Sequence, residues 1–192
     1  MFRKILYLFA VLLLLSCSNN LRIKDVKQFM GQQITIPDDS YTVWKGRETI
    51  LFDFTKTPIN LVVWYDSLGC TSCEASRISG WSEIVAYTDS LNQWISIIFL
   101  FTPKKKDIHR VKIALQTDDF DYPIFIDQNA TFVKQNSKLP KNSQLHSFLL
   151  DKNNKVVLVG NPLYNTTLWG LYKKTIQCLI DNDGELPNKI MQ

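Results

Sequence analysis

The 192-residue sequence lacks the features of several common functional classes. It contains no phosphate-binding loop, no nucleotide fingerprint and no Ser, His and Asp arrangement of the kind used by hydrolases. Histidine occurs only twice, and the net charge of +4 is mild. Because no basic helix or interleaved aromatic stripe accompanies that charge, the sequence does not indicate a nucleic-acid-binding protein. With no internal repeat and 45% apolar residues, one globular domain with short appendages is expected.

The N-terminus carries a long apolar run, from Ile5 to Leu15, behind the charged start Met-Phe-Arg-Lys. Eleven residues are too few to span a bilayer as a stable helix, but they suit the core of a signal peptide. The run ends in Leu14-Leu15-Ser16-Cys17, which resembles the lipobox of bacterial lipoproteins. The resemblance implies that residues 1–16 are a signal peptide and that Cys17 carries acyl chains such as palmitate. The alternative is an ordinary signal peptide followed by a chance cysteine.

Lipidation would decide where the protein resides. Two or three acyl chains hold a protein firmly on a membrane, so we expect a lipid-anchored protein of the cell envelope that faces the periplasm. Residues 17–30 would be a polar tether, 31–186 the folded domain and 187–192 a tail. Disulfides can persist outside the cytosol. With Cys17 committed to lipid, Cys70, Cys73 and Cys178 can form at most one intramolecular pair.

Hydrophobic periodicity predicts an α/β protein with a mixed central β-sheet flanked by helices and an N-terminal β extension. Strands are expected at Gln33–Ile36, Tyr41–Trp44, Thr49–Phe54, Ile59–Tyr65, Trp94–Phe101, Tyr122–Ile126, Leu145–Leu150 and Val156–Val159. Helices are expected from near Cys70 to about Ser90, bent near Gly80, and at Asp107–Gln116 and Ala130–Lys138. A last helix, capped by Thr166 or Thr167, would turn Leu168, Leu171, Thr175 and Leu179 inward.

The motif Gly69-Cys70-Thr71-Ser72-Cys73 follows a buried strand and opens a predicted helix. At a helix N-terminus, free N–H groups and the helix dipole stabilise a thiolate. Cys70 is therefore expected to be the exposed catalytic nucleophile with a lowered pKa. Cys73, one turn deeper, would be the resolving cysteine, and the two would form a redox-active disulfide. The alternative is a structural disulfide or an inactive pair.

The strand-Cys-x-x-Cys-helix arrangement resembles the thioredoxin-like superfamily, most closely the periplasmic thiol–disulfide oxidoreductases of the TlpA/ResA type. The segment Ser147-Phe148-Leu149-Leu150-Asp151 is similar to the family's Pro-Thr-x-Phe-Leu-Ile-Asp strand. The resemblance implies a thioredoxin-like fold over roughly residues 30 to 181. It also places Leu145, where the family has a cis-proline, and His146 near the active site. Because a cis bond before a non-proline residue is costly, we expect a trans bond before Leu145.

Two other functions remain open. Cys70, Cys73 and His146 could form a three-ligand copper or zinc site, similar to that of the copper-handling Sco proteins, although the spacings differ. Copper would then be the cofactor, whereas an oxidoreductase of this type needs none. A catalytically silent thioredoxin-like domain that binds another envelope protein is the third possibility.

Several further residues have expected structural roles. Periodicity places Trp64, Trp81, Trp94, Tyr65 and Phe99 in the core, whereas Trp44 and Trp169 are candidates to rim a partner groove. His109 is expected on a surface helix, and Cys178 in the core. Asp66 and Glu74 could move protons near the cysteines but are expected to be solvated.

The sequence thus predicts a membrane-anchored periplasmic thiol–disulfide oxidoreductase. Its partners would be protein thiols or disulfides in the envelope, a redox partner of unknown identity and, through the lipid on Cys17, the membrane.

Overall fold

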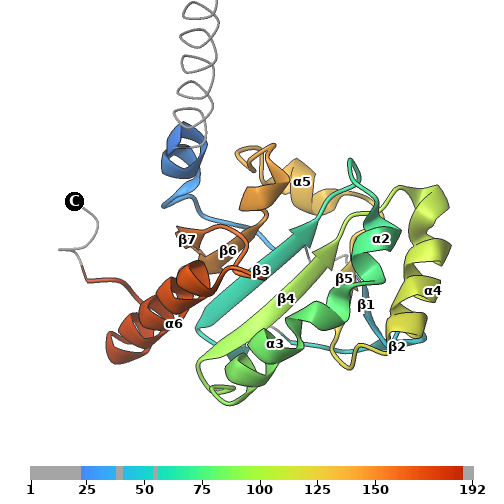
Figure 1. Cartoon of the computed structure of the whole chain (residues 1–192). Coiled ribbons are helices and arrows are strands. Elements are labelled where there is room, and N and C mark those ends of the chain that lie inside the picture. The colour runs from blue at the N-terminus through green and yellow to red at the C-terminus, as the bar shows by residue number, and fades with distance from the viewer. Residues whose placement is uncertain (1–22, 38–40, 54–55, 188–192) are drawn as a thin grey trace, which may run out of the picture.

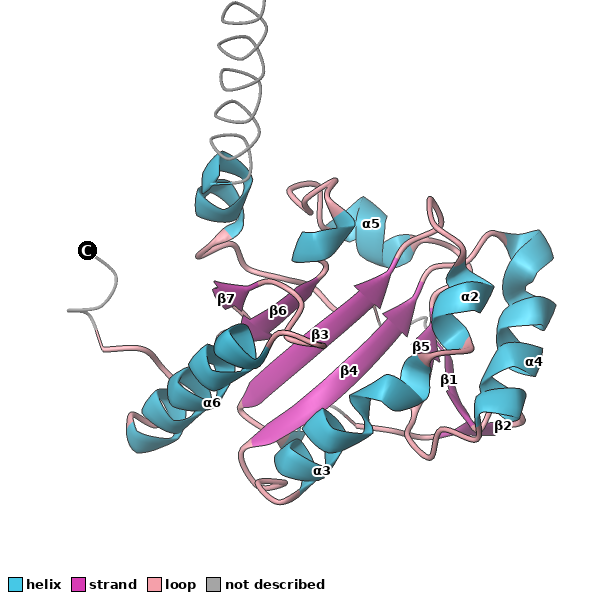
Figure 2. Cartoon of the chain, viewed as in Figure 1, coloured by secondary structure: helices cyan, strands magenta, loops and turns pink. Residues whose placement is uncertain are grey.

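The computed structural model describes residues 23–37, 41–53 and 56–187, which form a seven-stranded mixed sheet with helices on its faces (Figures 1 and 2). The strand order is β2-β1-β5-β4-β3-β6-β7. The pairs β3–β4 and β4–β5 are parallel, and the other neighbouring pairs are antiparallel. The predicted mixed sheet is confirmed. The signal peptide, Cys17 and residues 188–192 of the tail lie outside the described residues.

The strands agree with the predicted segments, apart from their ends. They are β1 (Tyr41–Trp44), β2 (Glu48–Ile50), β3 (Ile59–Tyr65), β4 (Ile95–Phe101), β5 (Ile124–Ile126), β6 (Ser147–Leu150) and β7 (Val156–Val159). The strand expected at 33–36 is reduced to an isolated bridge between Gln33 and Lys155. The start of the segment expected at 145–150 is instead the end of a 3-10 turn, Ser143–Leu145, which leads into β6.

The helices are α2 (Thr71–Ala75), α3 (Ser82–Asp89), α4 (Ile108–Asp118), α5 (Thr131–Gln135) and α6 (Thr166–Asp181). Residues 23–29 are also helical. In the described ranges, no helix is both long enough and apolar enough to cross a membrane.

The single helix expected from Cys70 to Ser90 is in fact interrupted. A 3-10 turn, Ile78–Trp81, separates α2 from α3. The Asp118 carboxylate at the end of α4 accepts hydrogen bonds from the Ser79 backbone N–H at 2.6 Å and from its hydroxyl at 3.1 Å. The interruption includes Gly80, where a bend was expected, and a side chain from a distant helix satisfies a backbone N–H group there.

The central strands are buried on both faces. Ile59, Leu61 and Val63 of β3 point into a core that the cysteine-bearing helix region, α3, α4 and α6 cover, whereas Val62 and Trp64 point into a second core. This alternation follows from the two-residue repeat of a strand, and it explains the nearly continuous apolar run of β3. The parallel strands β3 and β4 end at the edge of the sheet where the cysteine motif begins (Figure 1).

The described part of the expected tether, residues 23–30, packs onto the domain. Phe29 is only 1% exposed, and its ring meets that of Phe148 edge-on at 5.0 Å between centroids. Just beyond it, the Gly31 N–H donates to the carbonyl of Val156 in β7 at 2.8 Å. The folded unit therefore begins before residue 30.

The last helix corrects two details of the sequence prediction. Asn165, rather than Thr166 or Thr167, caps α6, and its side chain accepts a hydrogen bond from the Leu168 N–H at 3.0 Å. The inward face is also rotated. Tyr172, Ile176 and Leu179 are buried in α6, whereas Leu171 is exposed and Leu168 and Thr175 are half-buried.

Candidate functional site

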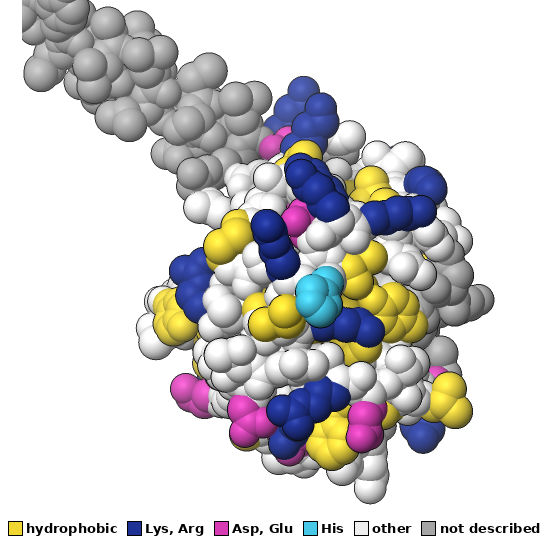
Figure 3. All heavy atoms as spheres, turned by 90° about the vertical axis from the view of Figure 1, so that its right-hand side faces the viewer, with side chains coloured by type: hydrophobic (Ala, Val, Ile, Leu, Met, Phe, Trp, Pro, Cys, Tyr) yellow, Lys and Arg dark blue, Asp and Glu magenta, His cyan; other side chains and the backbone are white. Residues whose placement is uncertain are grey.

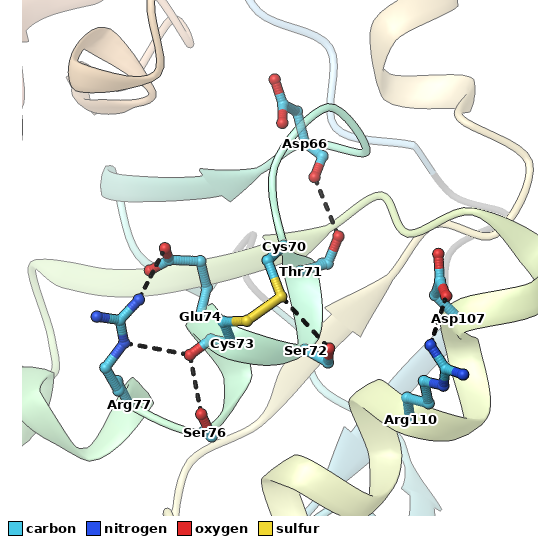
Figure 4. Close-up of a disulfide and its surroundings, with 10 residues drawn as sticks. All are labelled: Asp66, Cys70, Thr71, Ser72, Cys73, Glu74, Ser76, Arg77, Asp107 and Arg110. Carbon is cyan, nitrogen blue, oxygen red and sulfur yellow. Dashed lines mark hydrogen bonds and ion pairs between the residues drawn. A yellow bond between two sulfur atoms is a disulfide. The ribbon is translucent and has the colours of Figure 1, made fainter.

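Cys70 and Cys73 form a disulfide at the start of α2, with 5.2 Å between their Cα atoms (Figure 4). Cys70 is the N-cap of α2, and its carbonyl accepts hydrogen bonds from the N–H groups of Cys73 and Glu74. Both cysteines are exposed. Cys73 is therefore accessible, although it lies about one helical turn after Cys70. The Ser72 hydroxyl lies 3.7 Å from the sulfur of Cys70.

The loop before the disulfide is organised by Asp66. Its carboxylate Oδ1 accepts hydrogen bonds from the N–H groups of Leu68 at 3.0 Å and Gly69 at 3.2 Å. Its backbone carbonyl accepts a bond from the Thr71 hydroxyl at 3.2 Å, as Figure 4 shows. These three bonds close a turn between the end of β3 and the first helical residue, and they fix the position from which Cys70 is presented.

The Asp66 carboxylate is largely buried, with its side chain 14% exposed, which contradicts the expectation of a solvated acid. Glu74 fits that expectation better, since its side chain is 46% exposed. It pairs with Arg77 one turn further along, at 3.4 Å. No local pattern distinguishes the two acids, because the histidine that Asp66 faces lies eighty residues further along the chain.

That histidine is His146, which is 3% exposed. Its ring lies against the indole of Trp64 with 4.0 Å between centroids. Nε2 lies 2.8 Å from the carbonyl oxygen of Pro140. Because a carbonyl only accepts hydrogen bonds, Nε2 carries the proton of a neutral ring. Nδ1 is then the nitrogen that faces Asp66, and it lies 4.0 Å from Oδ2 of the Asp66 carboxylate. Burial lowers the pKa of His146, against the raising effects of the Pro140 bond and the Asp66 charge.

A cavity of about 250 Å³ lies between the disulfide loop and the segment that enters β6. Gly69, Thr71 and Glu74 line it beside the disulfide. The remaining walls are formed by the end of β3 with Asp66, by residues around the Ser143–Leu145 turn, and by Asn161 after β7. His146 is one of the lining residues, whereas Leu145 is buried in the core. The exposed disulfide therefore lies beside a partly enclosed cavity whose lining is both polar and apolar.

Comparison with solved structures shows what this architecture resembles. A candidate protein disulfide isomerase from Bacteroides thetaiotaomicron matches with a TM-score of 0.53 and 14% identity, over 79% of this chain and 90% of that one. A candidate thiol:disulfide interchange protein DsbE from Chlorobium tepidum matches with a TM-score of 0.51 and 12% identity, over 78% and 97%. AhpC from Enterococcus faecalis matches with a TM-score of 0.52 and 11% identity, over 83% and 98%.

The fold is thioredoxin-like. No protein-family model and no curated protein matches the chain, so the likeness lies in the three-dimensional structure. The thioredoxin-like fold confirms the architecture expected from the cysteine motif and its flanking elements. The bond before Leu145 is trans, as predicted, since the described residues contain no cis peptide bond.

The alternative metal site finds no support in the thioredoxin-like domain. Within the described residues, no group of three or more His, Cys, Asp or Glu side chains is placed to hold a metal ion. The two cysteines are joined to each other, and Nε2 of His146 is bonded to the Pro140 carbonyl.

Most of the other expected placements agree with the thioredoxin-like structure. Trp64, Trp81 and Phe99 are buried, Tyr65 and Trp94 are half-buried, and His109 is exposed on α4. Trp44 is exposed, and its indole N–H donates to the Asp121 carboxylate. Trp169 is half-buried and lines a surface hollow with residues 162–166. Cys178 is a free thiol, but it is half-buried rather than a core residue.

Sequence reasoning missed the pairing of Asp66 with His146. Their proximity depends on the antiparallel pairing of β3 with β6, in which Val63 lies opposite Ser147. The positions of the two residues could have indicated the contact, because Asp66 directly follows β3 and His146 directly precedes β6.

Proposed function

We propose that this protein is a thiol–disulfide oxidoreductase that exchanges disulfides with protein partners through Cys70 and Cys73. The observation that carries the proposal is the exposed Cys70–Cys73 disulfide, which lies between β3 and α2 of a thioredoxin-like fold, next to residues that line a partly enclosed cavity. Two of the solved structures that this chain resembles are described as a candidate protein disulfide isomerase and a candidate thiol:disulfide interchange protein, which supports the same chemistry.

In the reduced protein, the Cys70 thiolate attacks a substrate disulfide. A mixed disulfide forms on Cys70, and one substrate sulfur leaves as a thiolate. The Cys73 thiolate then attacks the sulfur of Cys70, which releases the second substrate thiolate and restores the Cys70–Cys73 disulfide. Two electrons pass from the protein to the substrate, and a separate redox partner returns them. The reverse sequence oxidises a substrate dithiol.

Cys70 is assigned as the nucleophile because of its position. It is the N-cap of α2, next to the backbone N–H groups at the N-terminus of that helix, and the Ser72 hydroxyl can donate to its sulfur. Both features favour a thiolate. The effect of a helix terminus is concentrated in the first turn, so the N-terminus of α2 can stabilise a thiolate although the helix is short.

The proposal includes anchoring in the cell envelope, with Cys17 acylated and the domain facing the periplasm. Support comes from the sequence Leu14-Leu15-Ser16-Cys17 behind a short apolar run. The expected mature N-terminus is acylated Cys17, and mass spectrometry of the membrane-extracted protein measures it directly. A Cys17→Ser variant should leave the membrane fraction; membrane retention of that variant would contradict the assignment.

The deciding experiment is a redox titration of the mature chain with Cys17→Ser and Cys178→Ala, which leaves only the active pair. Equilibration with glutathione or dithiothreitol buffers should give one two-electron transition between about −120 and −300 mV, the span of known oxidoreductases. Serine at Cys70 or Cys73 should abolish it. A disulfide that cannot be reduced while the chain stays folded would refute the redox function.

A further inference from the structure

Two neighbouring segments of the fold carry an unusual density of positive charge. Residues 23–30 and 131–145 together contain five lysines and a single acid, Asp25. The five are Lys24, Lys27, Lys134, Lys138 and Lys141, here called the lysine end, and all are exposed. Within the described ranges, none of them lies within ion-pair distance of a carboxylate. Their charge is therefore free to act on a partner.

The two segments lie side by side. Asp25 and Gln28 of the first line a shallow hollow together with Lys138 and Lys141 of the second. Phe29 borders a second hollow with residues 135–139. In Figure 1 the helix at 23–29 and α5 are at the top of the molecule, and in Figure 3 Lys and Arg side chains are spread through the upper half while most Asp and Glu side chains lie near the bottom. On the face that Figure 3 shows, most of the negative charge therefore lies away from the top of the molecule.

Apolar side chains are exposed among these lysines. Ile23 is 54% exposed, Val133 41% and Met30 37%. Lys24 and Lys27 lie on the helix at 23–29 and Lys134 on α5, whereas Lys138 and Lys141 follow in the loop after α5. At a membrane interface, ammonium groups meet anionic headgroups and exposed apolar groups enter the acyl boundary.

The short length of chain between Cys17 and Ile23 indicates that the lysine end faces a membrane. If Cys17 is acylated, as the proposed function holds, only five residues, 18–22, separate it from Ile23, which makes six Cα-to-Cα steps. Even fully extended, they span about 20 Å. The end of the domain that carries residue 23 must therefore stay close to the headgroups, and that end is the lysine end. We propose that the lysine end docks on the surface of an anionic bilayer.

Docking would also determine where the active site lies relative to the membrane. The chain that carries Lys138 and Lys141 continues directly into Ser143 and Gln144, which line the cavity beside the disulfide. His146 holds the same segment through its bond to Pro140. A domain seated on its lysine end thus presents the disulfide near the membrane surface, where it would meet membrane-bound or membrane-proximal substrates.

The test measures binding of the unacylated mature chain, Cys17→Ser, to vesicles of phosphatidylcholine with and without phosphatidylglycerol. This separates headgroup contact from lipid anchoring and from redox chemistry. The chain should bind the anionic vesicles only, and added salt should release it. Since each lysine at an anionic surface contributes about 1 kcal/mol, the triple variant Lys27→Gln, Lys138→Gln, Lys141→Gln should bind on the order of 100-fold more weakly.

The matched control is Lys56→Gln, Lys173→Gln, Lys174→Gln, which removes the same charge from exposed positions outside the lysine end. It should bind like the parent chain. Equal weakening by both triples would mean that net charge alone drives binding, and would overturn the proposal. So would a parent chain with no preference for anionic vesicles. An unchanged Cys70–Cys73 reduction potential in all variants would show that the redox function stands or falls independently.

Discussion

The Nδ1 atom of His146 lies 4.0 Å from the Oδ2 atom of Asp66, inside the cavity beside the Cys70–Cys73 disulfide. The Pro140 carbonyl fixes the proton of the neutral ring on Nε2, so Nδ1 is the nitrogen that titrates. Asp66 meanwhile holds the loop that presents Cys70. The two groups lie where the start of β6 approaches the turn before α2, and a proton taken up there alters the charge balance next to the disulfide.

The first prediction concerns pH and stability. Burial lowers the pKa of His146 below its ordinary value of 6.5. As the pH falls through 6.5, the unfolded chain binds a proton that the folded chain does not yet bind, so the free energy of unfolding should fall between pH 6.5 and the lowered pKa. Urea unfolding across this range measures it. In His146→Gln, whose amide N–H can still donate to Pro140, that part of the slope should disappear; parallel pH profiles would contradict the argument.

The second prediction concerns reduction of the disulfide. Cys70 and Cys73 close a loop of only four residues, so the chain-entropy model gives a stabilisation of about 2 kcal/mol. Dithiothreitol should therefore lower the free energy of unfolding by about that amount without unfolding the domain. The double variant Cys70→Ser, Cys73→Ser is the control and should not respond to the reductant. A fully unfolded reduced protein would indicate a purely structural disulfide.

The third prediction tests whether the folded unit begins before residue 30. Phe29 is buried against Phe148, so Phe29→Ala should cost about 3–5 kcal/mol of stability, the usual range for a large aromatic in a core. The neighbouring Met30→Ala, at a side chain 37% exposed, should cost much less. Thermal or urea denaturation compares the two. Similar small losses would mean that the segment is a loosely attached tether.

The fourth prediction concerns the start of α6. The Asn165 side chain accepts the Leu168 N–H, so Asn165→Ala should destabilise the protein by about 1 kcal/mol. Thr166→Ala, the position favoured by the sequence pattern, lies inside the helix on an exposed face and should change stability by less than about 0.5 kcal/mol. The reverse order in denaturation experiments would restore Thr166 as the cap.

Local patterns determined much of the fold. β3 was predicted with both its ends correct, because its seven residues form a continuous β-rich run between polar segments. The mixed sheet followed from the alternation of strands and helices and from the late hairpin. The expected helix after Cys70 is divided into two at the position of the expected bend near Gly80, where the Asp118 carboxylate from α4 bonds the Ser79 N–H. On α6 the expected inward position of Leu179 is confirmed, whereas Leu171 is exposed and Tyr172 and Ile176 are buried instead.

The sequence by itself determined the strand-Cys70-x-x-Cys73-helix plan, since apolar periodicity and motif spacing are properties of neighbouring residues. The signal peptide and the lipid on Cys17 stay predictions. Only the tertiary structure decided that Asp66 is buried, that His146 faces it, and that the lysines of two distant segments share one end of the molecule. Each of these is a relation between residues far apart in the chain, fixed by strand pairing and packing rather than by local preference.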